Sequence, residues 1–206
     1  MKYIILLFSL SILLSITLPE EIGICTNVTG AVYRSGKIRS GKIRKGESIY
    51  NGDKVFTMDK NAFISLLNTK DKSIISLYGN SVIKIFRYAK KDSTKTEINI
   101  FGGRVSAELR KTKNSKYIVN TPSSIAVSQE TSFQVGHRTM NDHGPYYQGV
   151  SDCVFSVLTG KLNLQNTKSE KTIDIGEGKT VISTSNGEFL IFETTDGFTQ
   201  YFKEPK

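Results

Sequence analysis

Two stretches of this chain share one pattern: INIFGGRVSAEL, residues 98–109, and FSVLTGKLNLQN, residues 155–166. In both, apolar and polar residues alternate, a glycine interrupts the run, a basic residue follows, and the alternation resumes. A period of two is typical of β-strands, and glycine favours tight turns because it adopts positive φ without strain. We therefore expect each stretch to form a β-hairpin, with its turn at Gly102-Gly103 or at Thr159-Gly160.

The same period of two continues through most of the chain after Thr26. Short apolar runs such as VFTMDKNAFISLLN (55–68) and SIISLYGNSVIKIFRY (73–88) contain or are bounded by Gly, Asn or Asp. Such runs are typical of an all-β domain with many tight turns. Because the runs also resemble one another, we expect a single all-β domain of stacked β-hairpins, forming an elongated β-sandwich or a β-roll or solenoid-like structure.

Composition agrees with a folded domain that attracts acidic partners. The chain has 206 residues, of which 38% are hydrophobic and 23% are charged, so it can bury a core. Its net charge is +9, which favours long-range attraction to acidic molecules but does not determine the fold.

The N-terminus, MKYIILLFSLSILLSITLPEE, predicts export. Its apolar run from Tyr3 to Leu18 is shorter than the roughly 20 residues that span a bilayer, and suits a secretory signal peptide. We expect residues 1–17 to be removed after Thr17, which places the protein in the periplasm or at the cell surface. An uncleaved anchor, with membrane association through the N-terminus, and a buried N-terminal helix remain alternatives.

Export affects the interpretation of the two cysteines, Cys25 and Cys153. In an oxidising compartment they can form one disulfide, which would close a long loop, and we predict this disulfide. Two unpaired thiols that behave as small hydrophobic side chains, and lipid attachment at Cys25, remain open alternatives.

Several motifs, in this order, resemble the FecR family of β-rich extracytoplasmic domains, which is named after a regulator of iron transport. KGESIYNGDKVFT (45–57) resembles the family's Gly-Asp segment, and EINIFGGRVSAEL (97–109) resembles its Gly-x-Val hairpin. YIVNTPSSIAVSQETSFQV (117–135) is similar to its Thr-Pro element and the strand that follows. One departure is Gln129-Glu130-Thr131, where the family usually has Arg-Gly-Thr.

The resemblance implies a FecR-like domain over residues 29–184. We expect a linker or first strand at 18–28 and a C-terminal strand and tail at 185–206. Well-known family members carry a cytoplasmic anti-sigma segment before a membrane span. Because only Met1 and Lys2 precede the apolar run, we expect no such segment here.

We interpret the chain as an exported, non-enzymatic binding or scaffold protein of the bacterial cell envelope. It would recognise a protein partner or an anionic envelope polymer through loops. The alternative is an extracytoplasmic signalling subunit of a sigma-factor and receptor regulatory system. Motifs of nucleophilic enzymes, such as G-x-S-x-G, are missing from the sequence.

The stretch SGKIRSGKIRKGESIYNGD, residues 35–53, is the most basic part of the chain. Its candidate anion-binding side chains are Lys37, Arg39, Lys42, Arg44 and Lys45. Its two isoleucines are spaced for neither a strand nor a helix, so we interpret it as a loop or frayed hairpin with a solvated basic face. The alternative is a genuine anion site. No aromatic residues lie among these cations, so we expect no nucleic-acid partner.

A second loop, GHRTMNDHGPYYQGVSD at 136–152, has exposed aromatic residues as its best candidates. Tyr146 and Tyr147 could contact a partner. His137, Asp142 and His143 are weak metal candidates, because their spacing is not that of a typical zinc site. We therefore expect no metal and no other cofactor.

Overall fold

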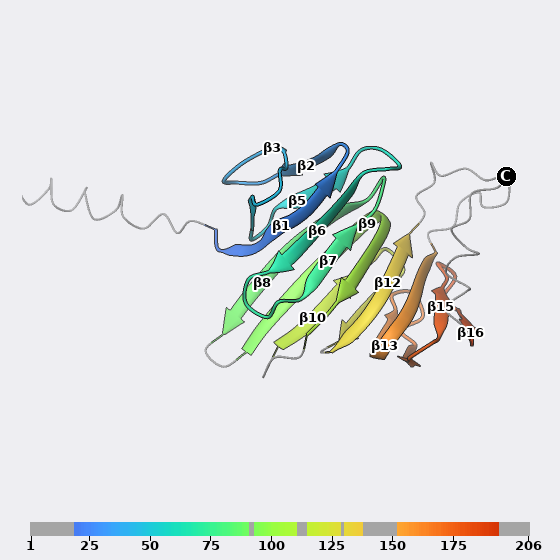
Figure 1. The fold of residues 1–206 in the computed structure, drawn as a ribbon. Helices are drawn as coiled ribbons and strands as arrows, with labels where there is room; N and C mark the ends of the chain where they lie inside the picture. Colours follow the sequence, from blue (N-terminus) through green and yellow to red (C-terminus); the bar gives the residue numbers. More distant parts are fainter. Residues whose placement is uncertain (1–18, 91–92, 111–114, 129, 138–151, 194–206) are drawn as a thin grey trace, which may run out of the picture.

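The computed structural model describes residues 19–90, 93–110, 115–128, 130–137 and 152–193 (Figure 1). Within these ranges the chain forms sixteen β-strands and no helix, so the all-β prediction is confirmed. This described part accordingly contains no helix long and apolar enough to cross a membrane. The predicted signal peptide, residues 1–17, lies outside the described residues.

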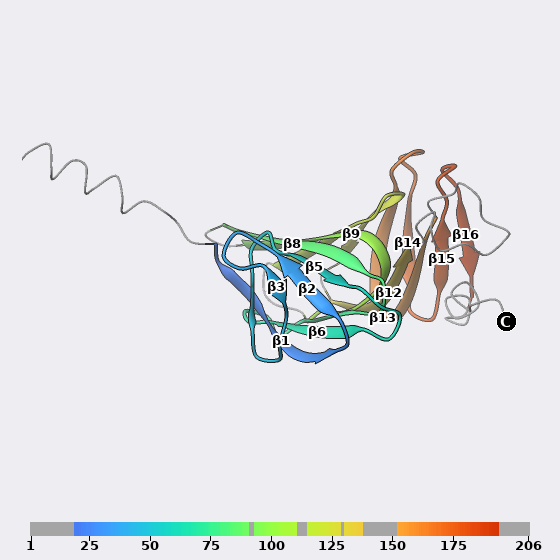
Figure 2. The same cartoon turned by 90° about the horizontal axis from the view of Figure 1, so that it is seen from above.

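The strands lie in two layers, called sheet I and sheet II below, which Figure 2 shows edge-on around β1 to β9. Strands β9 (Ser93–Glu108) and β13 (Cys153–Asn166) belong to both layers. The other strands of sheet I are β4 (Ser48–Tyr50), β1 (Glu21–Thr29), β6 (Phe63–Asn68), β7 (Ile74–Leu77), β12 (Thr131–His137), β15 (Thr180–Ser183) and β16 (Phe189–Phe192). The other strands of sheet II are β3 (Gly41–Lys42), β2 (Val32–Ser35), β5 (Lys54–Thr57), β8 (Val82–Lys90), β10 (Ser115–Asn120), β11 (Ser124–Ser128) and β14 (Thr172–Gly176).

Five of these strands close into a ring. The second half of β9 pairs with β12, which pairs with the first half of β13. The second half of β13 pairs with β11, β11 pairs with β10, and β10 returns in parallel to the first half of β9. The remaining strands extend the two layers outside this small closed barrel. The structure therefore has a barrel where we expected a sandwich or a solenoid-like stack.

The predicted hairpins at 98–109 and 155–166 are wrong, because each stretch belongs to one long strand that bends. β9 bends at Gly103 and β13 at Gly160, with φ of 84° and 83°. A Cβ at Gly103 would lie 2.6 Å from the Asn80 carbonyl oxygen, and one at Gly160 would lie 2.5 Å from that of Glu130. Glycine is thus required for both the backbone conformation and the close approach of the backbone just before β8 or β12, and it carries each strand from one sheet to the other.

The alternation of apolar and polar residues explains the core. Inward side chains of both sheets are aliphatic and buried, for example Val55, Ile83 and Ile98 in sheet II and Ile64 and Leu77 in sheet I. Because successive side chains of a strand point to opposite faces, the intervening residues form the outer faces of the sheets. The segment 18–28, expected as a linker or a first strand, contains most of β1, which pairs with β4 and β6.

Candidate functional site

The basic stretch forms a short hairpin of β2 and β3, in which Tyr33 lies opposite Lys42. All five candidate basic side chains are exposed. Ile43, however, is only 1% exposed and belongs to the core, and its N–H donates to the Val32 carbonyl at 2.9 Å. The stretch is therefore a hairpin that one isoleucine fixes to the core, with a basic outer surface.

The five cations of this hairpin have different environments. Arg39 pairs with Glu47 Oε1 at 3.1 Å. Within the described part of the chain, the other four candidates make no ion pair with a carboxylate. Part of the predicted anion site is thus already neutralised by the protein itself.

The Gly-Asp motif of this region is structural. Buried Arg34 donates to the Ser48 carbonyl and, at 2.8 Å, to Glu47 Oε2. Asp53 is buried and accepts the Tyr50 N–H at 3.0 Å. Burial raises the pKa of Asp53, and the bond from Tyr50 and the charge of Arg34 partly oppose this rise. These contacts fix the base of the hairpin.

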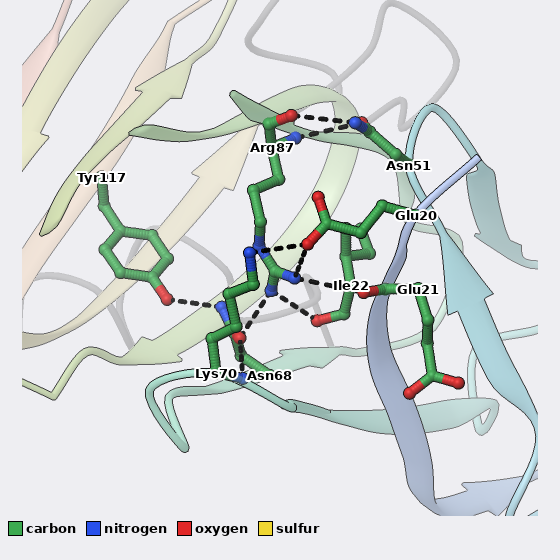
Figure 3. Close-up of polar contacts among 8 residues, drawn as sticks. All are labelled: Glu20, Glu21, Ile22, Asn51, Asn68, Lys70, Arg87 and Tyr117. Carbon is green, nitrogen blue, oxygen red and sulfur yellow. Dashed lines mark hydrogen bonds and ion pairs between the residues drawn. The ribbon is translucent and has the colours of Figure 1, made fainter. Parts of the chain in front are cut away.

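A second buried arginine, Arg87 of β8, holds the start of β1 (Figure 3). Its Nη2 donates to the Ile22 carbonyl at 2.7 Å and to Asn68 Oδ1 at 2.6 Å, and its Nη1 donates to the Glu21 carbonyl at 3.2 Å. Nη1 also lies 3.6 Å from Glu20 Oε1. The guanidinium therefore adds to the pairing of β1 with β4, at the point where that ladder is irregular between Glu21 and Gly23.

The Arg87 network continues to β10 and to the turn between β6 and β7. Asn68 Nδ2 donates to Tyr117 Oη at 2.9 Å, and Tyr117 in turn donates to the Asp71 carboxylate. Burial, and then the bond to Asp71, raises the pKa of Tyr117. Lys70 lies 2.7 Å from Glu20 Oε1, and this hydrogen bond lowers the pKa of Glu20. The network thereby joins the start of β1, the turn between β6 and β7, and β10 to Arg87 of β8.

The predicted disulfide between Cys25 and Cys153 is not formed, and both are buried free cysteines. Cys25 lies in β1 and Cys153 begins β13, and β6, β7, β9 and β12 lie between these strands in sheet I. At nearly 5 Å per strand, the two thiols are about 20 Å apart or more. A disulfide needs Cα atoms within about 7 Å, so the order of the strands in sheet I excludes it.

The structure instead brings Cys153 to His137, its partner in the β12–β13 ladder. Cys153 Sγ lies 3.5 Å from His137 Nδ1. Sequence reasoning missed this pair, because only the strand register brings the two residues together. Burial raises the pKa of Cys153, so the thiol stays neutral rather than becoming the nucleophilic thiolate. The geometry favours a packing role for the pair.

The remaining sequence candidates, Asp142, His143, Tyr146 and Tyr147, lie outside the described residues. His137 is described, but the residues that the structure places contain no group of three or more His, Cys, Asp or Glu side chains that could hold a metal ion. A wide polar depression of about 700 Å³ lies where β9, β12 and β13 meet. Its lining residues include Glu108, Arg110, Thr131 and Thr159.

Taken together, the fold and these sites define an all-β domain whose buried charges serve its structure. The sequence model of the FecR protein family matches residues 59–161, which is half of the chain. The chain belongs to this family, and the expected resemblance is confirmed. No curated protein matches the chain.

Solved structures agree with this assignment at the level of the fold. Two crystal structures of a candidate anti-sigma factor from Parabacteroides distasonis ATCC 8503, at 1.65 and 2.50 Å resolution, are similar to this protein. Their TM-scores are 0.53 and 0.54, both at 16% sequence identity. The matches cover 70% and 72% of this chain but only 62% and 63% of theirs, so this chain matches less than two thirds of that protein.

Proposed function

We propose that this protein acts in a bacterial signalling system by binding another protein outside the cytoplasm. Membership of the FecR protein family carries the proposal, because the family is named after a regulator. The likeness in fold to a candidate anti-sigma factor points the same way. The signalling subunit, which was the alternative interpretation of the sequence, is thus favoured over an envelope scaffold that recognises its ligand through loops.

The Arg87 network suits a domain that transmits a binding event along its own chain. Arg87 lies in the core of sheet II and holds the carbonyl groups of Glu21 and Ile22 at the start of β1. Glu20 is tied to the same guanidinium and to Lys70. Through Asn68 and Tyr117 the same network reaches β10 of the barrel, so a partner bound to the barrel would be connected by hydrogen bonds to the start of β1.

We also infer that the protein works without catalysing a reaction. The one Cys–His pair in the described part of the chain is buried, and its thiol pKa is raised, which opposes nucleophilic attack. A binding role in the periplasm or at the cell surface needs only the rigid barrel and its exposed surfaces.

The signalling role is tested by deleting the gene in its native host and measuring all transcripts. We expect a defined set of transcripts to change several-fold, and expression of the intact protein from a second locus to restore them. Expression of a variant with Arg87→Ala is the matched comparison, and we expect it to restore them poorly. Transcript levels that are the same with and without the gene would overturn the proposal.

A further inference from the structure

The outer face of sheet II carries aromatic and lysine side chains that neither the core nor the proposed signalling role explains. We call it the aromatic–lysine face. Its members come from β2, β3, β5, β8 and the first half of β9, which are hydrogen-bonded neighbours. They are Tyr33, Lys42, Lys54, Phe56, Lys84, Phe86, Tyr88, Lys95 and Phe101.

The aromatic rings of this face form two nearly parallel pairs. Tyr33 and Phe56 are cross-strand partners, with ring centroids 5.8 Å apart and 20° between the ring planes. Phe86 and Tyr88 are 6.2 Å apart with 19° between their planes. Tyr88 is 47% exposed, and Phe101, toward the other end of the β8–β9 ladder, is 52% exposed. Large rings left this accessible on a sheet are characteristic of a binding surface.

Lysine ammonium groups lie close to these rings. Lys84 Nζ is 4.8 Å from the centre of the Phe86 ring, and Lys95 Nζ is 5.3 Å from that of Tyr88. Lys54 Nζ is 5.9 Å from the Phe101 ring. These are cation–π distances, so the ammonium groups and the rings form one continuous surface.

Two of the lysines are placed against each other. Lys54 and Lys84 are direct partners in the β5–β8 ladder. Like charges directly opposite on a sheet are destabilising. Neither ammonium makes an ion pair with any described carboxylate. An anionic group bound between them would remove this repulsion, so the pair points to a ligand with negative charge.

Polar groups border the same face on β9 and β10. Glu97 lies opposite Phe86 in the ladder and pairs with Lys95 at 3.1 Å. Asn120 Nδ2 donates to Glu97 Oε1 at 2.9 Å and to Asn99 Oδ1 at 2.7 Å. Carboxylate and amide groups side by side can accept from and donate to hydroxyl groups. The face thus offers rings, cations and hydroxyl-binding groups together.

We propose that the aromatic–lysine face binds an acidic polysaccharide. A sugar ring presents C–H groups on its flat sides, which pack on aromatic rings, and hydroxyl groups at its edge, which suit Glu97, Asn99 and Asn120. A carboxylate on the sugar would lie between Lys54 and Lys84. The proposal does not depend on the signalling role, since it concerns a different ligand.

Other anionic polymers fit this face less well. An extended peptide gains affinity by adding to a free strand edge, but β5 is paired on both sides and β8 pairs with β9 and, over Val82–Lys84, with β5. Beyond Lys84, the backbone of Gly52 and Asp53 and the side chain of Asn51 already bond this edge of β8. A single-stranded nucleic acid needs cations that follow its dense backbone charge. Here Glu97 already neutralises Lys95 and would repel phosphates. A polymer with hydroxyl groups and fewer charges matches the surface better.

The test is calorimetric titration of the purified protein with oligomers of polygalacturonate. We expect binding, and we expect the double substitution Lys54→Gln and Lys84→Gln to weaken it about tenfold or more, because two charge-assisted contacts are lost. The matched control is Lys37→Gln with Lys45→Gln, which removes the same charge from the basic hairpin. We expect this control to bind within about twofold of the parent protein, because screening weakens distant charges.

Four further titrations complete the test. Phe86→Leu with Tyr88→Leu keeps the charge and removes the rings, and we expect weaker binding. A neutral dextran of the same length should bind much less than polygalacturonate. Tighter binding of oligo-dT or of poly-glutamate would overturn the choice of ligand. No binding of polygalacturonate, or an equal loss from the two lysine double variants, would overturn the site. Circular dichroism spectra confirm that each variant is folded.

Discussion

Strand β8 presents different chemistry on its two faces. Ile83, Ile85 and Arg87 point inward and are buried, and the guanidinium of Arg87 makes its hydrogen bonds within the protein. Lys84 and Tyr88 point outward, where Lys84 faces another lysine. The inward face accounts for the fold. The outward face carries large and charged side chains that the fold does not require, so it is the place to look for function.

The outer face of sheet I is more polar at its centre, although it too carries a cation–π contact, with Arg104 4.3 Å from the centre of the Tyr78 ring. There, Ser65, Ser76, Ser106 and Gln134 lie in register across β6, β7, β9 and β12. These side chains are small or neutral, and Ser76 Oγ donates to Ser65 Oγ at 3.3 Å. The two layers therefore share one core but present different outer surfaces, and the aromatic–lysine face is the one on which two lysines, Lys54 and Lys84, are direct partners across strands.

Among the substitutions proposed here, we expect Arg87→Ala, on the inward face of β8, to lower the free energy of unfolding the most. Arg87→Ala removes the buried guanidinium that donates to the carbonyls of Glu21 and Ile22 and to Oδ1 of Asn68. We expect a loss of about 3–5 kcal/mol in the free energy of unfolding. Urea unfolding followed by circular dichroism measures it. Lys84→Ala, on the outer face of the same strand, should change stability by no more than about 0.5 kcal/mol.

The next contrast uses two consecutive residues of β9. Ile98 is buried in the core, whereas Asn99 points outward and accepts a hydrogen bond from Asn120. Ile98→Ala should cost about 2–5 kcal/mol, because it leaves a cavity. Asn99→Ala should cost only about 0.5–1.5 kcal/mol, the worth of one hydrogen bond. Thermal unfolding of both variants checks this, and similar losses would contradict the assignment of the two faces.

A smaller effect is expected at Glu20, at the rim of the Arg87 network. The hydrogen bond from Lys70 lowers the pKa of Glu20 in the folded protein, so its carboxylate stabilises the fold above the unfolded pKa of about 4.5. This stability is lost as pH falls through the lowered folded pKa. Glu20 is 40% exposed, so Glu20→Gln should cost less than about 1 kcal/mol at pH 7. Urea unfolding at pH 7 and at pH 3 should show that this cost disappears in acid.

The smallest effect is expected on the basic hairpin. Replacing its five basic candidates with serine, which lowers the net charge from +9 to +4 (9 − 5), removes only exposed side chains. We expect the free energy of unfolding to change by less than about 1 kcal/mol. Ile43→Ala in the same hairpin should instead cost about 2–5 kcal/mol. Guanidinium unfolding of both variants distinguishes the outward from the inward side chains, and a large loss in the serine variant would show that the cations are structural.

Local patterns in the sequence were sufficient for the class of fold and for the family. These patterns failed where one sequence pattern is compatible with two different structures. A glycine between two alternating runs marks either a hairpin turn or a bend, and Gly103 and Gly160 prove to be bends. The disulfide failed for a similar reason, because the distance between Cys25 and Cys153 depends on the order of strands between them.

The aromatic–lysine face was missed because its members come from five separate strands. Tyr33, Phe56 and Phe86 become neighbours only through strand register. One local signal was present: in residues 84–88, Lys84, Phe86 and Tyr88 alternate with buried side chains. An outward row of lysine and aromatic residues on a strand of period two could have suggested a binding face. Sequence reasoning instead concentrated on the more basic stretch at 35–53.

Because β9 and β13 are shared between the two sheets, they determine how short a fragment of this chain can be and still fold by itself. The segment that matches the family, 59–161, ends within β13, before Asn163–Asn166 pair with β11. It also begins after β1 and β5, which pair with β6 and β8. That fragment would open the barrel and leave β6, β8, β11 and β13 with free edges, which favour aggregation. The segment that the family model recognises, 59–161, is therefore shorter than the segment that the fold requires.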